Sequence, residues 1–168
     1  MSTPHVLVAY GSRHGSTTGI AETVADELRR RGCIASVRPA RNVKDLVRYD
    51  AVVLGGALYA GHWHADARHF AHRFRQPLSM MPLWLFSSGP LDDSASDHEI
   101  APVRGVERLR VDLGGRGHAT FGGCLQPDVE GVIASRMARD HSGDHRDERQ
   151  IREWAGAIAS ELLPVHVH

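Results

Sequence analysis

Hydroxyl and glycine residues are concentrated in one short stretch near the start of the chain, from Gly11 to Thr18. An apolar run from Val6 to Tyr10 precedes this stretch, and apolar residues at helical spacing follow it up to Leu28. The pattern predicts a strand, a turn and a helix. Backbone N–H groups at a helix N-terminus are unpaired and carry partial positive charge, so they attract anions. Because Ser and Thr hydroxyls can donate further hydrogen bonds to phosphate oxygens, the stretch predicts a phosphate site.

Two better-known phosphate loops are excluded by pattern, and one simpler interpretation stays open. The stretch lacks the Gly-Lys-Ser/Thr ending of a P-loop, and Gly11 and Gly15 do not fit Gly-x-Gly-x-x-Gly. Its single cation, Arg13, suits a phosphate monoester held mainly by neutral donors. Ser and Thr before a helix can also serve only as an N-cap and a turn, which is the alternative to anion binding.

Two later stretches could contact a flat ring system, and both follow apolar runs of strand length. The first is Gly55 to His64, which contains Tyr59 and Trp63, and the second is Ser87 to Asp93. Aromatic faces can stack on a ring, and glycines allow the backbone to approach a ligand closely. Tyr59 and Trp63 could instead be ordinary loop or core aromatics.

Alternating strand and helix patterns are expected to position these stretches. Strands are predicted at 6–10, 33–37, 51–56, 82–88 and 118–123, and helices at 17–31, 65–74, 99–113, 129–139 and from Asp144 or Asp147 to Pro164. Asn42 is expected to cap a short helix through Val47, and Gly32 to end the first helix. The alternation predicts one α/β domain over residues 1–168, with a parallel sheet covered on both faces. Ligands bind beyond the carboxyl ends of such strands, so the three stretches are expected at one edge.

Composition limits the classes of function. The chain has 168 residues, with 20 Lys and Arg against 20 Asp and Glu, and zero net charge argues against nucleic acid as the main partner. Cys33 and Cys124 form no CxxC motif and are interpreted as structural thiols. There is no leader pattern, and no apolar run approaches the roughly 20 residues of a membrane span, so we expect a soluble, cytoplasmic protein.

Metal binding is not expected, although the chain has 12 histidines. His62 and His64 are two residues apart, and His69 and His72 are three apart on a predicted helix. Such pairs can hold a metal ion, but no third ligand of fixed spacing accompanies them.

The stretch that follows the first strand resembles the FMN phosphate loop of the flavodoxins. The matching positions are Val8, Tyr10, Ser12, Gly15, Thr17, Ala21 and Val24, and Ala9 is the one departure from that pattern. The later stretch from Gly55 to His64 is similar to the strand-3 loop of the menaquinone-dependent protoporphyrinogen dehydrogenases, a branch with a flavodoxin domain. Their Gly-His-aromatic-His motif corresponds to residues 61–64.

The resemblance implies a flavodoxin-like three-layer sandwich: a five-stranded parallel sheet of order 2-1-3-4-5 with helices on both faces. It also implies non-covalently bound FMN, with the redox chemistry carried by the flavin. The residues expected to bind FMN are Ser12, Arg13, His14, Gly15, Ser16, Thr17, Thr18, Ala57, Leu58, Tyr59, Ala60, Gly61, His62, Trp63, Ser87, Ser88, Gly89 and Pro90. No side chain is assigned as catalytic, but His62 and His64 could exchange a proton because His titrates near neutral pH.

Three functions are left open by the sequence. The preferred one is an FMN oxidoreductase of the protoporphyrinogen dehydrogenase type, with a small-molecule or quinone acceptor. The alternatives are an FMN electron carrier that serves a partner protein, and a non-redox binding domain on the same fold. The substrate, the electron donor and the oligomeric state, including a homodimer, stay open.

Overall fold

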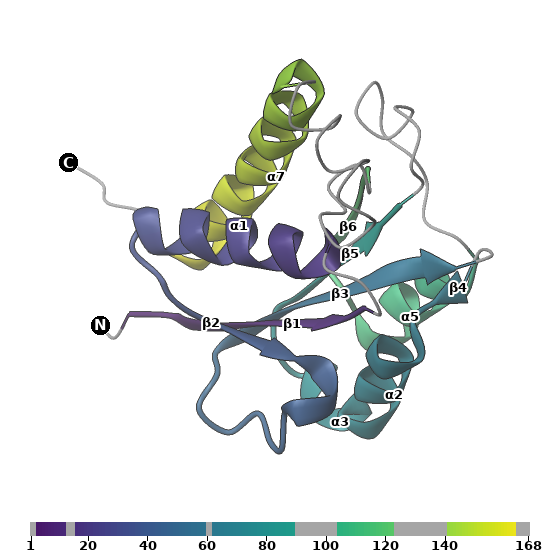
Figure 1. Ribbon diagram of the computed structural model, residues 1–168. Helices are drawn as coiled ribbons and strands as arrows, with labels where there is room; N and C mark the ends of the chain where they lie inside the picture. Colours follow the sequence, from purple (N-terminus) through teal and green to yellow (C-terminus); the bar gives the residue numbers. More distant parts are fainter. Residues whose placement is uncertain (1–2, 13–15, 60–61, 90–103, 123–140, 164–168) are drawn as a thin grey trace.

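Five parallel strands form the central layer of the protein (Figure 1). A computed structural model describes residues 3–12, 16–59, 62–89, 104–122 and 141–163. In chain order the elements are β1 (His5–Gly11), α1 (Ser16–Arg30), β2 (Ile34–Pro39), the 3-10 helix η1 (Ala40–Asn42), β3 (Ala51–Tyr59), β4 (His62–Trp63), α2 (Ala65–Arg73), α3 (Arg75–Leu78), β5 (Leu83–Ser88), α5 (Arg104–Leu113), β6 (Gly117–Phe121) and α7 (His141–Leu162).

The strand order is β2-β1-β3-β5-β6, and every pair along this path is parallel. The predicted order 2-1-3-4-5 is confirmed, since β5 and β6 are the fourth and fifth predicted strands. The sixth strand, β4, has two residues and pairs antiparallel with the end of β3. It was not predicted, because two residues carry no readable periodicity.

The sheet is covered on both faces, as predicted. Helices α1 and α7 lie on one face, and α2, α3 and α5 lie on the other (Figure 1). Side chains of β1 alternate between the two cores: Val6 and Val8 pack with α1 and α7, whereas Leu7 and Ala9 pack with the α2 side. All four are fully buried, because successive strand side chains point to opposite faces of a doubly covered sheet.

Gly32 ends the first helix, as the sequence predicted. Its φ angle is +112°, a left-handed conformation that glycine adopts without a steric penalty. The backbone N–H of Gly32 donates to the carbonyl of Arg29 at 3.1 Å, and that of Cys33 donates to Leu28 at 2.9 Å. These two bonds satisfy carbonyl groups that the helix end would otherwise leave unpaired.

The predicted helix from Asn42 to Val47 is wrong. A 3-10 turn ends at Asn42, and residues 43–46 have no helical structure. The Asp45 carboxylate instead accepts a hydrogen bond from the backbone N–H of Val47 at 3.1 Å, a local turn that competes with a helix.

Other boundaries differ by a few residues. Helix α7 begins at His141, earlier than predicted, and β3 continues three residues past its predicted end at Gly56. The extension follows from pairing of β3 with β4 and β5, which periodicity does not report. The predicted helix at 129–139 lies outside the described residues.

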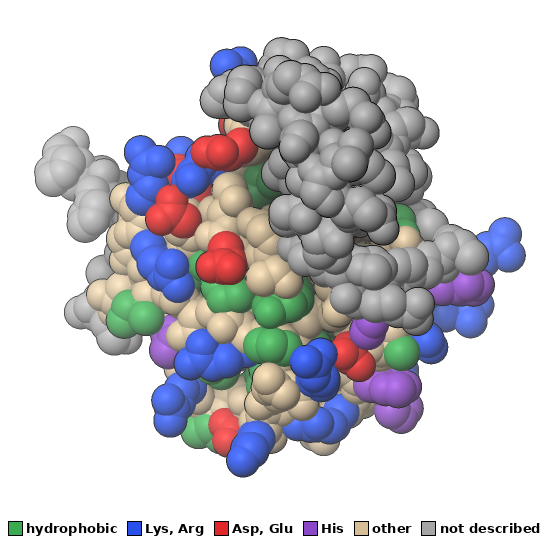
Figure 2. All heavy atoms as spheres, in the orientation of Figure 1, with side chains coloured by type: hydrophobic (Ala, Val, Ile, Leu, Met, Phe, Trp, Pro, Cys, Tyr) green, Lys and Arg blue, Asp and Glu red, His purple; other side chains and the backbone are tan. Residues whose placement is uncertain are grey.

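Charges of both signs are interspersed on the described part of the face in Figure 2. Histidine side chains gather toward the lower right, where Figure 1 places β4 and α2. The mixed surface agrees with the zero net charge of the chain.

Candidate cofactor site at the carboxyl edge of the sheet

The strand register brings the three predicted stretches to one edge of the sheet. Gly11 at the end of β1 pairs with Gly56 of β3, and Gly56 pairs with Ser87 of β5. Ser88 pairs in turn with Phe121, the last residue of β6. The chain therefore leaves β1, β3 and β5 at a common edge, where an open parallel sheet binds its ligand.

The first turn of α1 has the chemistry of an anion site. Thr17 is fully buried, and its Oγ1 has no hydrogen-bond partner among the described residues. A buried hydroxyl without a partner is costly, and a bound phosphate oxygen would satisfy it. The first turn contains no carboxylate to offset the positive end of the helix. These residues fit a phosphate group.

The remaining residues of the predicted phosphate stretch are only partly described. Ser12 and Thr18 are half-buried, Ser12 directly after β1 and Thr18 in the first turn of α1. Several predicted residues lie outside the described part of the chain: Arg13, His14, Gly15, Ala60, Gly61 and Pro90, together with the side chains of Ser16 and Tyr59. Their roles stay predictions.

Two glycines of β3 make room for the protein's own aromatic rings. A Cβ atom on Gly55 would lie 1.9 Å from Cζ of Phe86, and one on Gly56 would lie 2.9 Å from Cγ of Trp63. These rings belong to the two separate cores, so they pack on opposite faces of the strand. The sequence suggested that these glycines approach a ligand, whereas the structure shows that they accommodate side chains.

Trp63 lies in the core rather than in an open loop. Only 3% of it is exposed, and it packs in the core on the α2 side of the sheet. Of the two interpretations left open by the sequence, the structure favours the core role for this tryptophan. Tyr59, at the end of β3, is the aromatic residue that remains a candidate for contact with a flavin ring.

A chain of two hydrogen bonds, one buried and one partly buried, ties β4 to β5 and β6. Trp63 Nε1 donates to Ser87 Oγ at 3.0 Å, and Ser87 Oγ lies 3.0 Å from Nε2 of His118. Burial is the main cause that lowers the pKa of His118 to about 4, opposed by the negative charge of Glu107 and assisted by the positive charge of Arg110. His118 is therefore neutral at pH 7.

Ser87 thus has internal partners, and its side chain, 1% exposed, is turned into the structure. Ser88 is also buried, at 3% exposed. The next residue, Gly89, has a φ of +118°, and its N–H donates to the carbonyl of Phe121 at 2.9 Å. The end of β5 is therefore fixed by hydrogen bonds of Ser87 and Gly89 to β4 and β6. His118 was not predicted as part of the site, since no local motif marks it.

The two histidines expected to exchange protons occupy different environments. Nδ1 of His64 accepts a hydrogen bond from the backbone N–H of Asp66 at 3.0 Å, so this ring is the N-cap of α2. His62 is exposed at the surface. Of the pair, His62 has the freer access to solvent.

A family profile described as the flavodoxin domain matches residues 7–126 of the chain. The chain belongs to the flavodoxin domain family. This membership implies FMN as the cofactor and makes the chain a flavodoxin-fold redox protein of the FMN type, in agreement with the sequence prediction. Proteins of this kind pass electrons to redox partners.

Solved flavodoxins share the fold of this family member. Oxidised flavodoxin 2 from Bacillus cereus superposes with a TM-score of 0.65 at 20% identity, over 94% of this chain and 99% of that chain. A flavodoxin from the Archaea superposes with a TM-score of 0.62 at 15% identity, over 94% and 98% of the two chains.

Among curated proteins, the chain is similar to protoporphyrinogen IX dehydrogenase [quinone] of Escherichia coli K12. The two are 30% identical over 83 residues, which are 48% of this chain and 46% of that protein. The matched part of the chain therefore spans about half the length of this relative.

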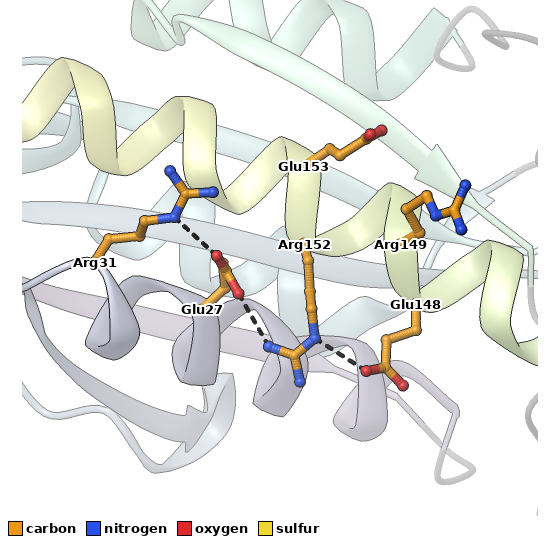
Figure 3. Close-up of a pocket in the computed structure, with 6 residues that line it drawn as sticks. All are labelled: Glu27, Arg31, Glu148, Arg149, Arg152 and Glu153. Carbon is orange, nitrogen blue, oxygen red and sulfur yellow. Dashed lines mark hydrogen bonds and ion pairs between the residues drawn. The ribbon is translucent and has the colours of Figure 1, made fainter.

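A hollow of this flavodoxin-family chain lies between α1 and α7 and is lined by paired charges (Figure 3). Glu27, with a side chain 9% exposed, lies 2.8 Å from Nε of Arg31 and 3.1 Å from a guanidinium nitrogen of Arg152. Arg152 also binds Glu148 at 3.0 Å. The Arg31 hydrogen bond is the main cause that lowers the pKa of Glu27. These charges join two helices, so we assign this hollow a structural role.

The described residues contain neither a cluster of metal-ligating side chains nor a helix suited to span a membrane. No group of three or more His, Cys, Asp or Glu side chains comes together there as a metal site. No helix within that part of the chain combines the length and apolarity that crossing a bilayer requires.

Proposed function

We propose that this chain is an FMN-dependent oxidoreductase that transfers electrons between a small organic substrate and a small-molecule or quinone acceptor. The support is the partial likeness to a quinone-dependent dehydrogenase, at 30% identity over 83 residues. The sequence Gly61-His-Trp-His64, which resembles the strand-3 loop of such dehydrogenases, adds to it. FMN supplies the electron-accepting ring, and the protein binds and orients it.

The observation that carries FMN binding at this edge is the buried, unpaired hydroxyl of Thr17. In the proposal this hydroxyl and the backbone N–H groups at the start of α1 hold the phosphate. Tyr59 contacts the flavin ring, and the backbone around Ser88 and Gly89 contacts its polar edge. In the same proposal His62, which is exposed at the start of β4, exchanges protons with solvent.

Replacing Thr17 by valine tests the phosphate site. The side chains are nearly equal in volume, so Thr17→Val removes mainly the hydroxyl. A hydrogen bond to a charged group contributes about 1.5–3 kcal/mol, so we expect FMN affinity to fall roughly tenfold to hundredfold. The FMN-free protein should be equally stable or more stable, because a buried unpaired hydroxyl is lost.

Thr23→Val is the matched control on the same helix. The Thr23 hydroxyl donates to the Gly19 carbonyl at 3.0 Å and lies at the exposed surface. This variant should bind FMN with unchanged affinity. Wild-type affinity in Thr17→Val, measured by quenching of FMN fluorescence, would contradict the proposed phosphate site.

The second candidate is an FMN electron carrier. The observation that favours it is the superposition on whole flavodoxin chains of similar length, along 94% of this chain. The two functions differ in how the reduced protein reacts with a water-soluble naphthoquinone under anaerobic conditions. A quinone-linked enzyme should show a reoxidation rate that saturates with quinone concentration, because a complex forms first. A carrier should show a slow rate that rises linearly without saturation.

A further inference from the structure

A small pocket lies between β4, α2 and α5, on the face of the sheet opposite α1. Its volume is about 240 Å³. Trp63, Val106 and Leu109 give it an apolar lining, and the first two are almost fully buried. Pockets for drug-sized ligands measure roughly 300–1,000 Å³, so this one suits a molecule of one or two rings.

Charged side chains at this pocket have an excess of positive charge. Arg68 and Arg108 line it together with one acid, Asp112, which gives a net charge of plus one with histidine neutral. Nε of Arg68 donates to the backbone carbonyl of Trp63 at 3.1 Å, so the guanidinium is anchored to the backbone of β4. Within the described residues, Arg108 and Asp112 have no ion-pair or hydrogen-bond partner, and both are exposed.

We propose that this pocket is a binding site for a small amphipathic anion, namely an aromatic ring system bearing one carboxylate or sulfonate. The ring lies against Trp63 and Leu109, and the anionic group faces Arg68 and Arg108. An arginine already held by a backbone carbonyl loses less freedom on binding, and its planar fork matches a carboxylate. This pocket contains no residue of α1, where the phosphate site is proposed. The proposed anion binding therefore does not depend on the redox function proposed for the protein.

The pocket also contacts the cofactor edge. Trp63 lines the pocket, and its indole N–H donates to Ser87 at the end of β5. A ligand in the pocket would therefore lie next to a residue that ties the end of β3 to β5.

The test uses 2-naphthoate as the probe and the Trp63 indole N–H signal in nitrogen–proton correlation NMR spectra as the readout. Titrations are run on the protein with and without saturating FMN. We expect a saturable shift of this signal in both, and weaker binding of the uncharged 2-naphthamide. Displacement of naphthoate by FMN, or equal binding of the amide, would overturn the proposal.

Two charge changes of opposite sign make the test specific. Arg108→Gln should weaken naphthoate binding about threefold to tenfold, and Asp112→Asn should strengthen it by a similar factor, from the Coulomb energy of charges a few ångströms apart near water. A folding defect cannot produce opposite effects at two neighbouring surface positions. Arg75→Gln, on α3 outside the pocket, is the control and should change nothing. Unchanged affinity in both pocket variants would refute the anion site.

Discussion

Acidification should destabilise this protein through His118. Burial lowers its pKa from the ordinary value of 6.5 to about 4. Between these values the unfolded chain binds a proton that the folded chain excludes, so stability falls as the pH falls through this window. This pKa difference of roughly 2.5 units corresponds to a total loss of about 3 kcal/mol in the free energy of unfolding once His118 is protonated in both states. About 2 kcal/mol of this should be lost between pH 8 and pH 5.

The surroundings of His118 explain why the neutral form is favoured. Its Nε2 lies 3.0 Å from the hydroxyl of Ser87, which is itself buried and accepts a hydrogen bond from Trp63. Glu107 favours the charged ring and Arg110 opposes it, and both effects are smaller than that of burial. Glu107 also binds Arg110 at 2.7 Å, which limits the help it can give to a protonated histidine.

The assay is urea unfolding, followed by tryptophan fluorescence at pH 8 and pH 5. His118→Gln keeps a polar group near Ser87 but cannot titrate. We expect this variant to be less stable than wild type at pH 8, and to lose about 2 kcal/mol less between pH 8 and pH 5. His72→Gln, an exposed histidine on α2, is the control and should lose as much as wild type.

The outcome that refutes this reasoning is a difference between variants that does not depend on pH. If His118→Gln and wild type lose the same stability between pH 8 and pH 5, His118 does not titrate as its burial requires. A suppressed pH dependence in His72→Gln would equally show that the effect is not specific to the buried ring.

Four further substitutions test the packing and the helix contact by the same unfolding assay. Gly55→Ala places a methyl group 1.9 Å from the Phe86 ring and should cost about 1–3 kcal/mol, whereas Gly19→Ala meets no atom within 4 Å and should stabilise α1 by about 0.5–1 kcal/mol. Equal effects at the two glycines would contradict the packing argument. Glu27→Gln removes the buried charge that pairs with Arg31 and Arg152 and should cost about 1–3 kcal/mol, since each arginine loses its ion pair with Glu27. Glu148 is half-exposed, so Glu148→Gln should cost under about 1 kcal/mol of unfolding free energy. A larger loss than that of Glu27→Gln would contradict the conclusion that Glu27 is the main acid of this ion-pair network.

The sequence by itself predicted the features that depend on neighbouring residues. The apolar runs at Val6 to Tyr10 and Pro82 to Ser88 appear as strands buried on both faces, and Gly32 ends α1. The phosphate site after β1 was predicted because hydroxyls, glycines and a helix start follow one another directly, and it stays a prediction. Strand order and FMN binding followed from the same local pattern through its family resemblance.

The tertiary structure decided which distant side chains meet. Trp63 and Ser87 are 24 residues apart in sequence, and Ser87 and His118 are 31 apart, so no local periodicity records their contact. The same holds for Gly55 and Gly56. The space beside each glycine, where a side chain would lie, is occupied by the ring of Phe86 or Trp63 from another strand. Local patterns specify an element and its buried face, but the pairing of buried polar groups depends on sheet register. That register places Trp63 in the core and lowers the pKa of His118, and both results depend on contacts across the sheet.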